Sequence, residues 1–512
     1  MTVEPTRPED ARASSEGVDP DPAGILTGSA LELPDMRLRS LVGHFGPGVI
    51  LAMTGIGTSH LVTAPAAGGR FAYALLWCIP VAYVFKYYGF EMAFRFTNAT
   101  GKSLMEAYGT AWKKWPLWYV LITTVIQAAV GQAGRLIAAS AVLYYLFTVT
   151  VGLPISLTVY GIILGVISVI TLLYGRYATL ERLAKIAGGV LAVCTVAVYL
   201  VRPAPTGEFV HFFIFETPQG SWLIIAAFLG LLPTGIDVSL QASEWGKAKK
   251  KGMSLIRDQL EESGHAGRFD PFNPRKEDLS VHTAGMNPHS LEYCRRWFQI
   301  GLWDFRIGHV GSFILACIFL LLAAVWLYPS PVEGRAVMGE IAGMFTQSVG
   351  PWMMVVFMIG AFAATFSTAF NYFDGWPRIV AACSRNLFRG TARVPGIARE
   401  DLDDERRRTW YSEYNIYRAT MVYSLVTSVL IIAGVPSPVF LVLVASALAY
   451  FVAPVIFFLN FYYCLTIIPK EDRAFYPSTF ARWFGWLSLA VFTGLSAILV
   501  AARVFNIELF GV

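Results

Sequence analysis

Long apolar segments, separated by shorter polar ones, make up most of this chain. About eleven of them reach the roughly 20 residues that a helix needs to cross a lipid bilayer. The pattern therefore predicts an all-α polytopic membrane protein. The segments lie near residues 43–66, 71–95, 116–147, 153–175, 183–201, 220–243, 303–328, 349–384, 412–434, 437–467 and 480–504.

Two of the apolar segments are interrupted, near residues 54–60 and 232–237, by glycine, proline and polar side chains. Proline removes a backbone donor, and glycine frees the turn around it. In hydrocarbon an unpaired peptide group costs several kcal/mol, so a broken helix is tolerated only where its freed groups meet protein, water or a ligand. Two interrupted spans in corresponding halves indicate a transporter with its site near the bilayer midplane.

The interruptions supply the candidate substrate-binding residues. Each interruption could instead be a simple kink, and the sequence leaves both interpretations open. The candidates are Gly55, Gly57, Thr58, Ser59 and His60 in the first span and Leu232, Pro233, Thr234, Gly235 and Asp237 in the sixth.

Composition places the chain in the membrane and gives no sign of an enzyme. Of 512 residues, 55% are hydrophobic and 15% charged, and the mean hydropathy is +0.53, which a soluble domain does not reach. Six scattered cysteines without CxxC spacing predict neither a zinc cluster nor a disulfide framework. Phosphate-binding, zinc-protease and hydrolase motifs are missing, and Gly101-Lys102-Ser103 lacks the upstream glycine of a Walker motif. We expect no enzymatic activity and no cofactor.

Lysine and arginine are concentrated in alternate loops. Residues 96–115, 174–186, 244–306, 376–411 and 468–482 hold nearly all the basic loop residues. The positive-inside rule then predicts a cytoplasmic N-terminus, an outside C-terminus and insertion in the plasma (inner) membrane. The basic clusters orient the chain or bind anionic lipid headgroups. Nucleic-acid binding has no support, since no basic patch sits on a soluble fold.

The same pattern divides the chain into a tail and one transmembrane domain. Residues 1–36 are polar and rich in proline, without a signal-peptide pattern, and predict a disordered cytoplasmic tail. Residues 37–512 form the transmembrane domain, in which 244–302 is a cytoplasmic connector with a short helix near 253–262.

Three short motifs resemble the Nramp family of divalent-metal transporters. They are Gly46-Pro47-Gly48, Leu75-Leu76-Trp77 and the turn Thr100-Gly101-Lys102-Ser103-Leu104-Met105-Glu106. Weaker likeness continues through most of the chain. The resemblance implies a LeuT-type 5+5 inverted repeat with broken helices 1 and 6, in which 43–201 and 220–467 are the two repeats and 480–504 is an extra helix.

The functional motifs of that family are replaced here. Its Asp-Pro-Gly-Asn corresponds to residues 57–60, and its Met-Pro-His-Asn corresponds to residues 232–235. Gln132 and Arg135 stand where the family carries acidic residues of its proton route. Divalent ions need close carboxylate, carbonyl, thioether or imidazole ligands, and His60 alone remains at the first interruption. We therefore expect a secondary transporter of a small solute, nominally a divalent metal cation, with manganese and iron disfavoured. Magnesium or a polar non-metal solute fits better.

Charged residues inside the spans suggest an internal network. Arg135 costs about 2.5–3.5 kcal/mol at a span centre on insertion scales, so it should face a partner inside the bundle. Asp237 and Asp374 are the candidates, and Gln132, Arg135, Asn371 and Asp374 form the predicted coupling or ion network. Structural ion pairing is the alternative role for both aspartates, and His60 is either a proton carrier or a packed, hydrogen-bonded histidine.

A membrane sensor or scaffold that does not transport is the alternative from another class. The signalling proteins of plants that retain an Nramp-like membrane domain carry a large soluble extension. This chain ends about eight residues after its last predicted span. That difference favours transport, although a separate partner protein could replace the extension.

Overall fold

The computed structural model describes most of the chain from Ile56 onwards. The described residues are 31–37, 40, 43, 44, 46, 48, 56–174, 178–262, 275–280, 283, 286–330, 332, 334, 335, 337–388 and 412–505. Within them every regular element is a helix. The predicted tail over residues 1–36 lies almost wholly outside the described residues.

Each predicted span corresponds to helix in the described part of the chain. The first five spans are η3 (Ile56–Thr63) with α3 (Ala64–Phe71), then α4 (Cys78–Thr100), then a run of η4 (Trp112–Lys114), α6 (Trp115–Ile126), η5 (Gln127–Gly131), α7 (Gln132–Leu143) and η6 (Tyr144–Thr150), then α8 (Leu157–Leu173) and α9 (Ala178–Val201). The later ones are α10 (Trp222–Leu231) with α11 (Val238–Ala248), α14 (Pro288–Trp326), α16 (Met353–Leu387), α18 (Glu413–Gly434), α19 (Pro438–Ile467) and α20 (Thr479–Phe505).

Six of these helical segments are long and apolar enough to cross a membrane unaided: Trp112–Thr150, Pro288–Trp326, Met353–Leu387, Glu413–Gly434, Pro438–Ile467 and Thr479–Ala501. The interrupted sixth span is divided into two short helices. The second span, α4, is long enough but carries Lys86, Glu91 and Arg95.

One predicted boundary is wrong. Helix α14 begins at Pro288, well inside the stretch 244–302 that was expected to be a loop. Glu292, Arg295 and Arg296 make its first turns polar, so the hydropathy pattern hides them. The short helix expected near 253–262 is confirmed as α12 (Met253–Glu262), and the remaining short elements are α5 (Leu104–Tyr108), η7 (Thr206–Phe212), α13 (Lys276–Leu279) and α15 (Val337–Val349).

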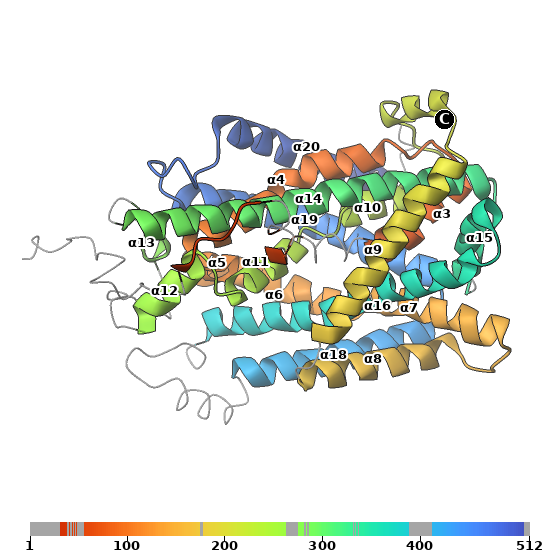
Figure 1. Cartoon of the computed structure of the whole chain (residues 1–512), viewed down its shortest axis with the longest axis horizontal. Coiled ribbons are helices and arrows are strands. Elements are labelled where there is room, and N and C mark those ends of the chain that lie inside the picture. The colour runs from red at the N-terminus through yellow and green to blue at the C-terminus, as the bar shows by residue number, and fades with distance from the viewer. Residues whose placement is uncertain are drawn as a thin grey trace, which may run out of the picture.

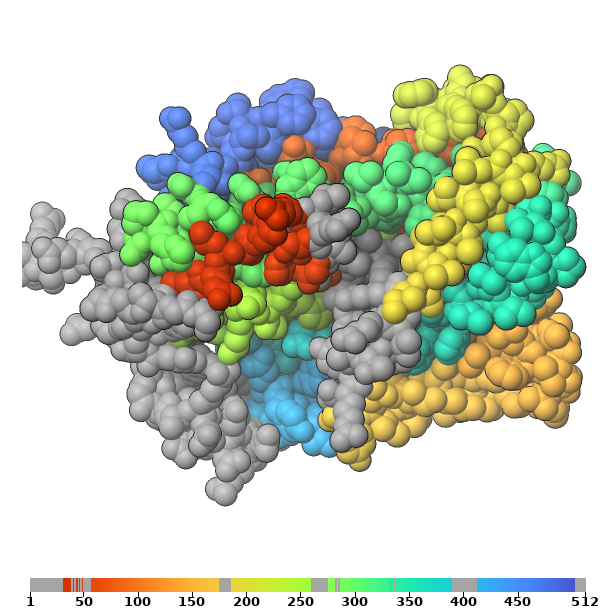
Figure 2. Space-filling model, viewed as in Figure 1, coloured from red at the N-terminus to blue at the C-terminus, as the bar shows by residue number. Residues whose placement is uncertain are grey.

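The long helices lie side by side (Figure 1). Helices α5, α12 and α13 gather at one end, whereas α3, α15 and η7 gather at the other. We call the first the basic end, because Lys102, Lys247 and Arg385 lie there. Helix α9 crosses the surface of the bundle at a slant (Figure 2).

Helix α19 lies at the centre of the bundle and packs against α10, α4 and α7. Close approach depends on small residues: a Cβ on Gly134 would lie 2.9 Å from the carbonyl oxygen of Leu441 in α19. The outer faces of α8, α18 and α20 are apolar and exposed, as a surface in contact with lipid tails must be. Their exposed side chains include Ile162, Ile163, Ile167, Ile170, Val422, Val426, Leu430 and Trp486.

Candidate functional site

The predicted break in the sixth span is confirmed. Helix α10 ends at Leu231 and α11 begins at Val238, so the residues between them leave the helix. Leu232, Thr234 and Ile236 are fully buried there, and Asp237 is 9% exposed. Carbonyl groups at the end of α10 have lost their helical partners and need others within the protein.

Lys86 of α4 supplies those partners. Its ammonium donates to the carbonyl oxygens of Gly230, Leu232 and Thr234 at 2.8, 2.7 and 2.8 Å. An ammonium has three donors, so these three bonds satisfy it completely. Sequence analysis missed this residue, although a lysine in the middle of an apolar span was itself a signal of function or pairing.

Arg135 of α7 faces the same break through two aromatic rings of α16. Its guanidinium carbon lies 3.8 Å from the ring centre of Tyr372 and 4.8 Å from that of Trp376. The Tyr372 hydroxyl is 2.9 Å from the Thr234 hydroxyl. The indole of Trp376 donates to Asp237 at 3.5 Å. The two rings therefore connect the arginine to both sides of the break.

The two predicted carboxylate partners of Arg135 have different outcomes. The prediction that Asp374 pairs with Arg135 is wrong. Its carboxylate pairs with Arg378 at 2.7 Å and accepts from Trp245 and Tyr417 at 2.9 and 2.7 Å. Its partners therefore lie on α16, α11 and α18, away from Arg135. Asp237 interacts electrostatically with Arg135. Within the described residues the two make no direct ion pair, and Arg135 donates instead to the Gly131 carbonyl at 2.7 Å.

Several amide and charged groups of η5, α7 and the start of α11 are buried without a partner in the described structure. They are both side-chain atoms of Gln127 and of Gln241, Gln132 Oε1, Arg135 Nε and Asp237 Oδ1. A Cβ on Gly131 would lie 2.5 Å from Gln127 Oε1, 2.7 Å from Trp376 and 3.0 Å from Arg135 Nη1, so these three side chains converge. Each unmet buried group costs about 1–3 kcal/mol. We call this set the polar cluster; a polar cargo or water would satisfy it.

The predicted interruption in the first span does not occur in its described part, residues 56–60. Residues Ile56–Thr63 are wound as a π-helix, η3, that continues directly into α3. The wider π turn accommodates glycine and polar residues without leaving the helix. Gly55 and the residues just before it lie outside the described residues. Gly57 packs tightly on α16, where a Cβ would lie 2.5 Å from the carbonyl oxygen of Ala364.

His60 is hydrogen-bonded on both ring nitrogens. Nε2 donates to the Ser312 carbonyl at 2.8 Å, and Nδ1 lies 2.9 Å from the Ser59 hydroxyl. The Tyr83 hydroxyl, 2.6 Å from that of Ser312, completes the network between η3, α4 and α14. These contacts favour the packed histidine over the proton carrier. Thr58 Oγ1 is buried with no partner in the described structure.

The other predicted network residues lie on α7 and α16. Gln132 Nε2 donates to the Ala369 carbonyl at 3.0 Å, so the amide spans the two helices. Asn371 is half-buried on α16. No group of three or more histidine, cysteine, aspartate or glutamate side chains that could hold a metal ion occurs in the part of the chain that the structure describes.

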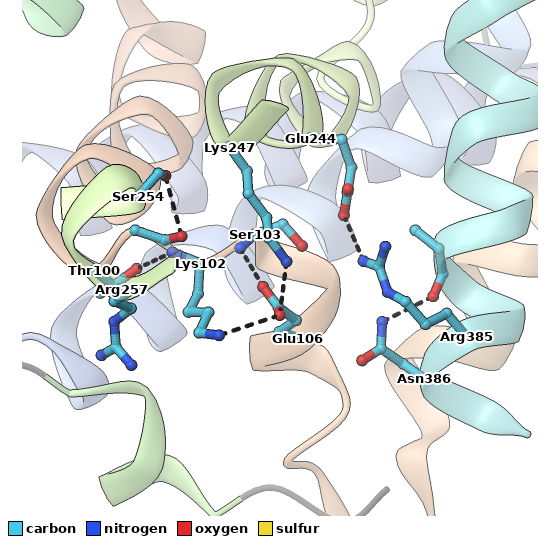
Figure 3. Close-up of polar contacts among 12 residues, drawn as sticks. Thr100, Lys102, Ser103, Glu106, Glu244, Lys247, Ser254, Arg257, Arg385 and Asn386 are labelled. Atoms are coloured by element: carbon cyan, nitrogen blue, oxygen red, sulfur yellow. Dashed lines mark hydrogen bonds and ion pairs between the residues drawn. The ribbon is translucent and has the colours of Figure 1, made fainter. Parts of the chain in front are cut away.

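A second charged network joins four helices at the basic end (Figure 3). Glu106 accepts from Lys247 at 2.8 Å and from the Ser103 backbone at 2.7 Å, and Lys102 lies 3.9 Å away. Burial alone would raise the pKa of Glu106, but Lys247, Lys102 and Arg385 hold it well below its ordinary value of 4.5.

Arg385 extends the basic-end network to α18. It pairs with Glu413 at 2.9 Å and with Glu244 of α11 at 3.4 Å. The turn at residues 100–106, which carries part of the family resemblance, thus lies where α5 contacts α11 and α16.

Comparison with known proteins identifies the family. The sequence profile of Nramp, described as natural resistance-associated macrophage protein-like, matches residues 48–502. The chain is 24% identical over 349 residues to an uncharacterised protein of Pasteurella multocida, covering 66% of this chain and 70% of the relative. It is 25% identical over 334 residues to the divalent metal cation transporter MntH of Chromohalobacter salexigens, covering 63% and 72%.

A solved structure shows the same fold. The crystal structure of a mutant manganese transporter from Eremococcus coleocola superimposes with a TM-score of 0.60 at 13% identity, covering 94% of this chain and 91% of that one. At this identity the likeness concerns the fold alone. It confirms the all-α transporter architecture that the sequence resemblance implied.

Proposed function

Because this chain belongs to the Nramp family of secondary transporters, we propose that its cargo binds at the α10–α11 break, beside the polar cluster. The observation that carries the proposal is the buried break itself, with unpartnered amides and a guanidinium beside it. Alternating access brings such a site to each side of the membrane in turn by rocking one bundle against the other. The basic-end network is the contact that has to open on one side.

The nominal cargo is a divalent metal cation, since the relatives named MntH are divalent metal cation transporters. The charges around the break disfavour manganese or iron. Lys86 and Arg135 bring two positive charges, whereas Asp237 brings one negative charge. A bare divalent ion would meet repulsion and few ligands of the required kind. Among metals, magnesium fits better because it keeps several of its waters, which need only hydrogen-bond acceptors.

A small polar solute without a metal is the second candidate. The observation that favours it is the combination of Arg135 with the side-chain amides of Gln127 and Gln241, all buried and with unmatched atoms. Guanidinium and amide groups recognise carboxylates, carbonyls and amides by planar hydrogen bonds. The rings of Tyr372 and Trp376, which lie against Arg135, would exclude water around such a cargo.

Uptake into proteoliposomes decides between these candidates. We expect weak or no uptake of radioactive manganese by the wild type. The Arg135→Gln variant should take up manganese to the same extent as the wild type. Magnesium uptake, followed with an entrapped indicator dye, tests the hydrated cation. Robust manganese uptake that is abolished by substitution of Gly57 or His60 would show that the argument from missing ligands is mistaken. Competition between a panel of small carboxylates and amides for binding to the purified protein tests the second candidate.

The orientation and the repeat boundaries belong to the same proposal. We place the basic end in the cytoplasm of a plasma (inner) membrane, in agreement with the distribution of lysine and arginine. Residues 43–201 and 220–467 are the proposed repeats, with α20 outside them. The spans interrupted or wound irregularly, η3 with α3 and α10 with α11, then hold the same place in each half.

A further inference from the structure

Lys86 occupies a place where broken transmembrane helices elsewhere hold an ion. Unwound carbonyls and the C-terminal ends of half-helices are the groups that coordinate monovalent cations in transporters built this way. Here the carbonyls of Gly230, Leu232 and Thr234 converge on one point, and the Lys86 ammonium lies at that point with three contacts of 2.7–2.8 Å. We infer that these carbonyls form a monovalent-cation site and that Lys86 fills it from within the chain.

The surroundings of Lys86 support a site built for positive charge. Its side chain is fully buried. The negative end of the α10 dipole points at it, because the last carbonyls of a helix carry partial negative charge. Asp237, on the far side of the break, interacts with it electrostatically. The rings of Phe90 and Phe492 lie 5.8 and 6.0 Å from its nitrogen. Carbonyls, a carboxylate and ring faces all favour a cation here.

A tethered cation has a functional consequence. A dissolved sodium or potassium ion in this site would bind and leave during each transport cycle, and its gradient could drive transport. An ammonium held by α4 cannot leave. The chain therefore keeps this part of the break charged and ordered throughout the cycle, and its transport does not draw on a monovalent-cation gradient at this site.

Removing the tether should turn the site into one that binds a dissolved cation. We would purify the full-length wild type and the Lys86→Ala variant and measure thermal unfolding in sodium, potassium, methylammonium and choline chloride at equal ionic strength. The expected result for Lys86→Ala is a saturable rise in Tm of a few degrees with the three small cations and none with choline, which is too large for the site. The wild type should respond equally to all four salts.

A control variant and a second pair of variants keep the outcome decisive. Arg306→Ala removes a cation of α14 that donates to the hydroxyl of Tyr87, next to Lys86 in the sequence of α4, and should give no cation-specific response. A folded Lys86→Ala protein whose Tm does not depend on the cation would overturn the inference.

If Lys86→Ala does not accumulate in membranes, Lys86→Arg and Lys86→Met are compared by size-exclusion chromatography. Accumulation of the arginine variant alone supports the cation site, and any other result contradicts it. Because stability is measured, failure here is separate from failure of the proposed function.

Discussion

Gly57 sets how closely the first described helix approaches α16. A Cβ at this position would lie 2.5 Å from the Ala364 carbonyl and would overlap the Thr368 hydroxyl. Both belong to the helix backbone or its hydrogen bonds, so neither gives way easily. We expect Gly57→Ala to lower the free energy of unfolding by about 1–3 kcal/mol through overpacking. Denaturation of the purified protein measures it.

The matched control for that variant is Gly189→Ala on α9. A Cβ there meets nothing within 4 Å, and alanine is favoured over glycine inside a helix by about 1 kcal/mol. We expect this variant to be as stable as the wild type or slightly more stable. Equal effects of the two substitutions would mean that Gly57 is not tightly packed.

Arg135 depends on the planar shape of its side chain as well as on its charge. Lysine keeps the charge but cannot lie flat on Tyr372 and Trp376. We expect Arg135→Lys to lose about 0.5–2 kcal/mol of stability, the range for a desolvated cation–π contact. Arg418→Lys is the control, since Arg418 is exposed and stacks on Tyr414 at 5.4 Å. A Tm shift no larger for Arg135→Lys than for the control would argue against the stacked geometry.

For single residues, the sequence predicted which side chains belong to the site but not all of their contacts. The polar and charged residue types at the site were visible in the sequence. Arg135 and Asp237 do interact, and Gln132, three residues before Arg135 on α7, bonds to α16. The partner of Asp374 could not be predicted, because the sequence allows an ion pair with a residue four positions along the same helix as readily as one across the bundle. Lys86 was missed because its partners are backbone carbonyl groups, which every residue carries and the sequence therefore does not distinguish.

At the scale of elements, proline made the break in the sixth span predictable, whereas the π-helical turn at residues 56–63 was not predicted. Pro233 cannot continue a helix, and Gly235 follows it, so the end of α10 could be located from composition. At residues 56–63 Gly57 and the polar side chains after it belong to a wide π-helical turn, whose formation depends on packing against neighbouring helices. Local sequence thus predicts where a helix must stop better than how a continuing helix is wound.

The basic-end network connects elements by charge, and Glu106 is its centre. Glu106→Gln keeps an acceptor for the Ser103 backbone but loses the ion pair with Lys247. We expect a loss of about 1.5–3 kcal/mol, the range for a hydrogen bond between charged groups. Glu292→Gln, which removes an exposed pair with Arg296, should change stability by no more than about 1 kcal/mol.

The contribution of Glu106 should also depend on pH. Its pKa is lower in the folded protein than the ordinary 4.5, so the unfolded chain binds the proton first as the pH falls. The stabilisation is therefore complete above pH 4.5 and is lost progressively below it. We would measure the free energy of unfolding of the wild type and of Glu106→Gln from about pH 3.5 to about pH 8. The difference between the two proteins should be constant near neutrality and smaller in acid. A difference that grows in acid would contradict the assignment.

For the whole molecule, the apolar pattern predicted the architecture almost completely. All eleven expected spans are helical where the structure describes them, since a bilayer permits few alternatives to a helix. The cargo was less predictable. It depends on which side chains from α4, α7, α11 and α16 meet at one break, and that meeting is a property of packing between segments far apart in the chain.

The orientation of the molecule gives a prediction that uses its two ends. Val210 in η7 and Glu277 in α13 are exposed at opposite ends (Figure 1). Lys102, Lys247 and Arg385 share the end of Glu277, so the positive-inside rule places Glu277 in the cytoplasm. In a chain with Cys194 replaced by alanine, the other cysteines are buried, so an introduced cysteine gives the signal. An impermeant maleimide should label Val210→Cys on intact cells and Glu277→Cys only after permeabilisation. The reverse pattern would invert the proposed orientation and place the Glu106 network on the outside.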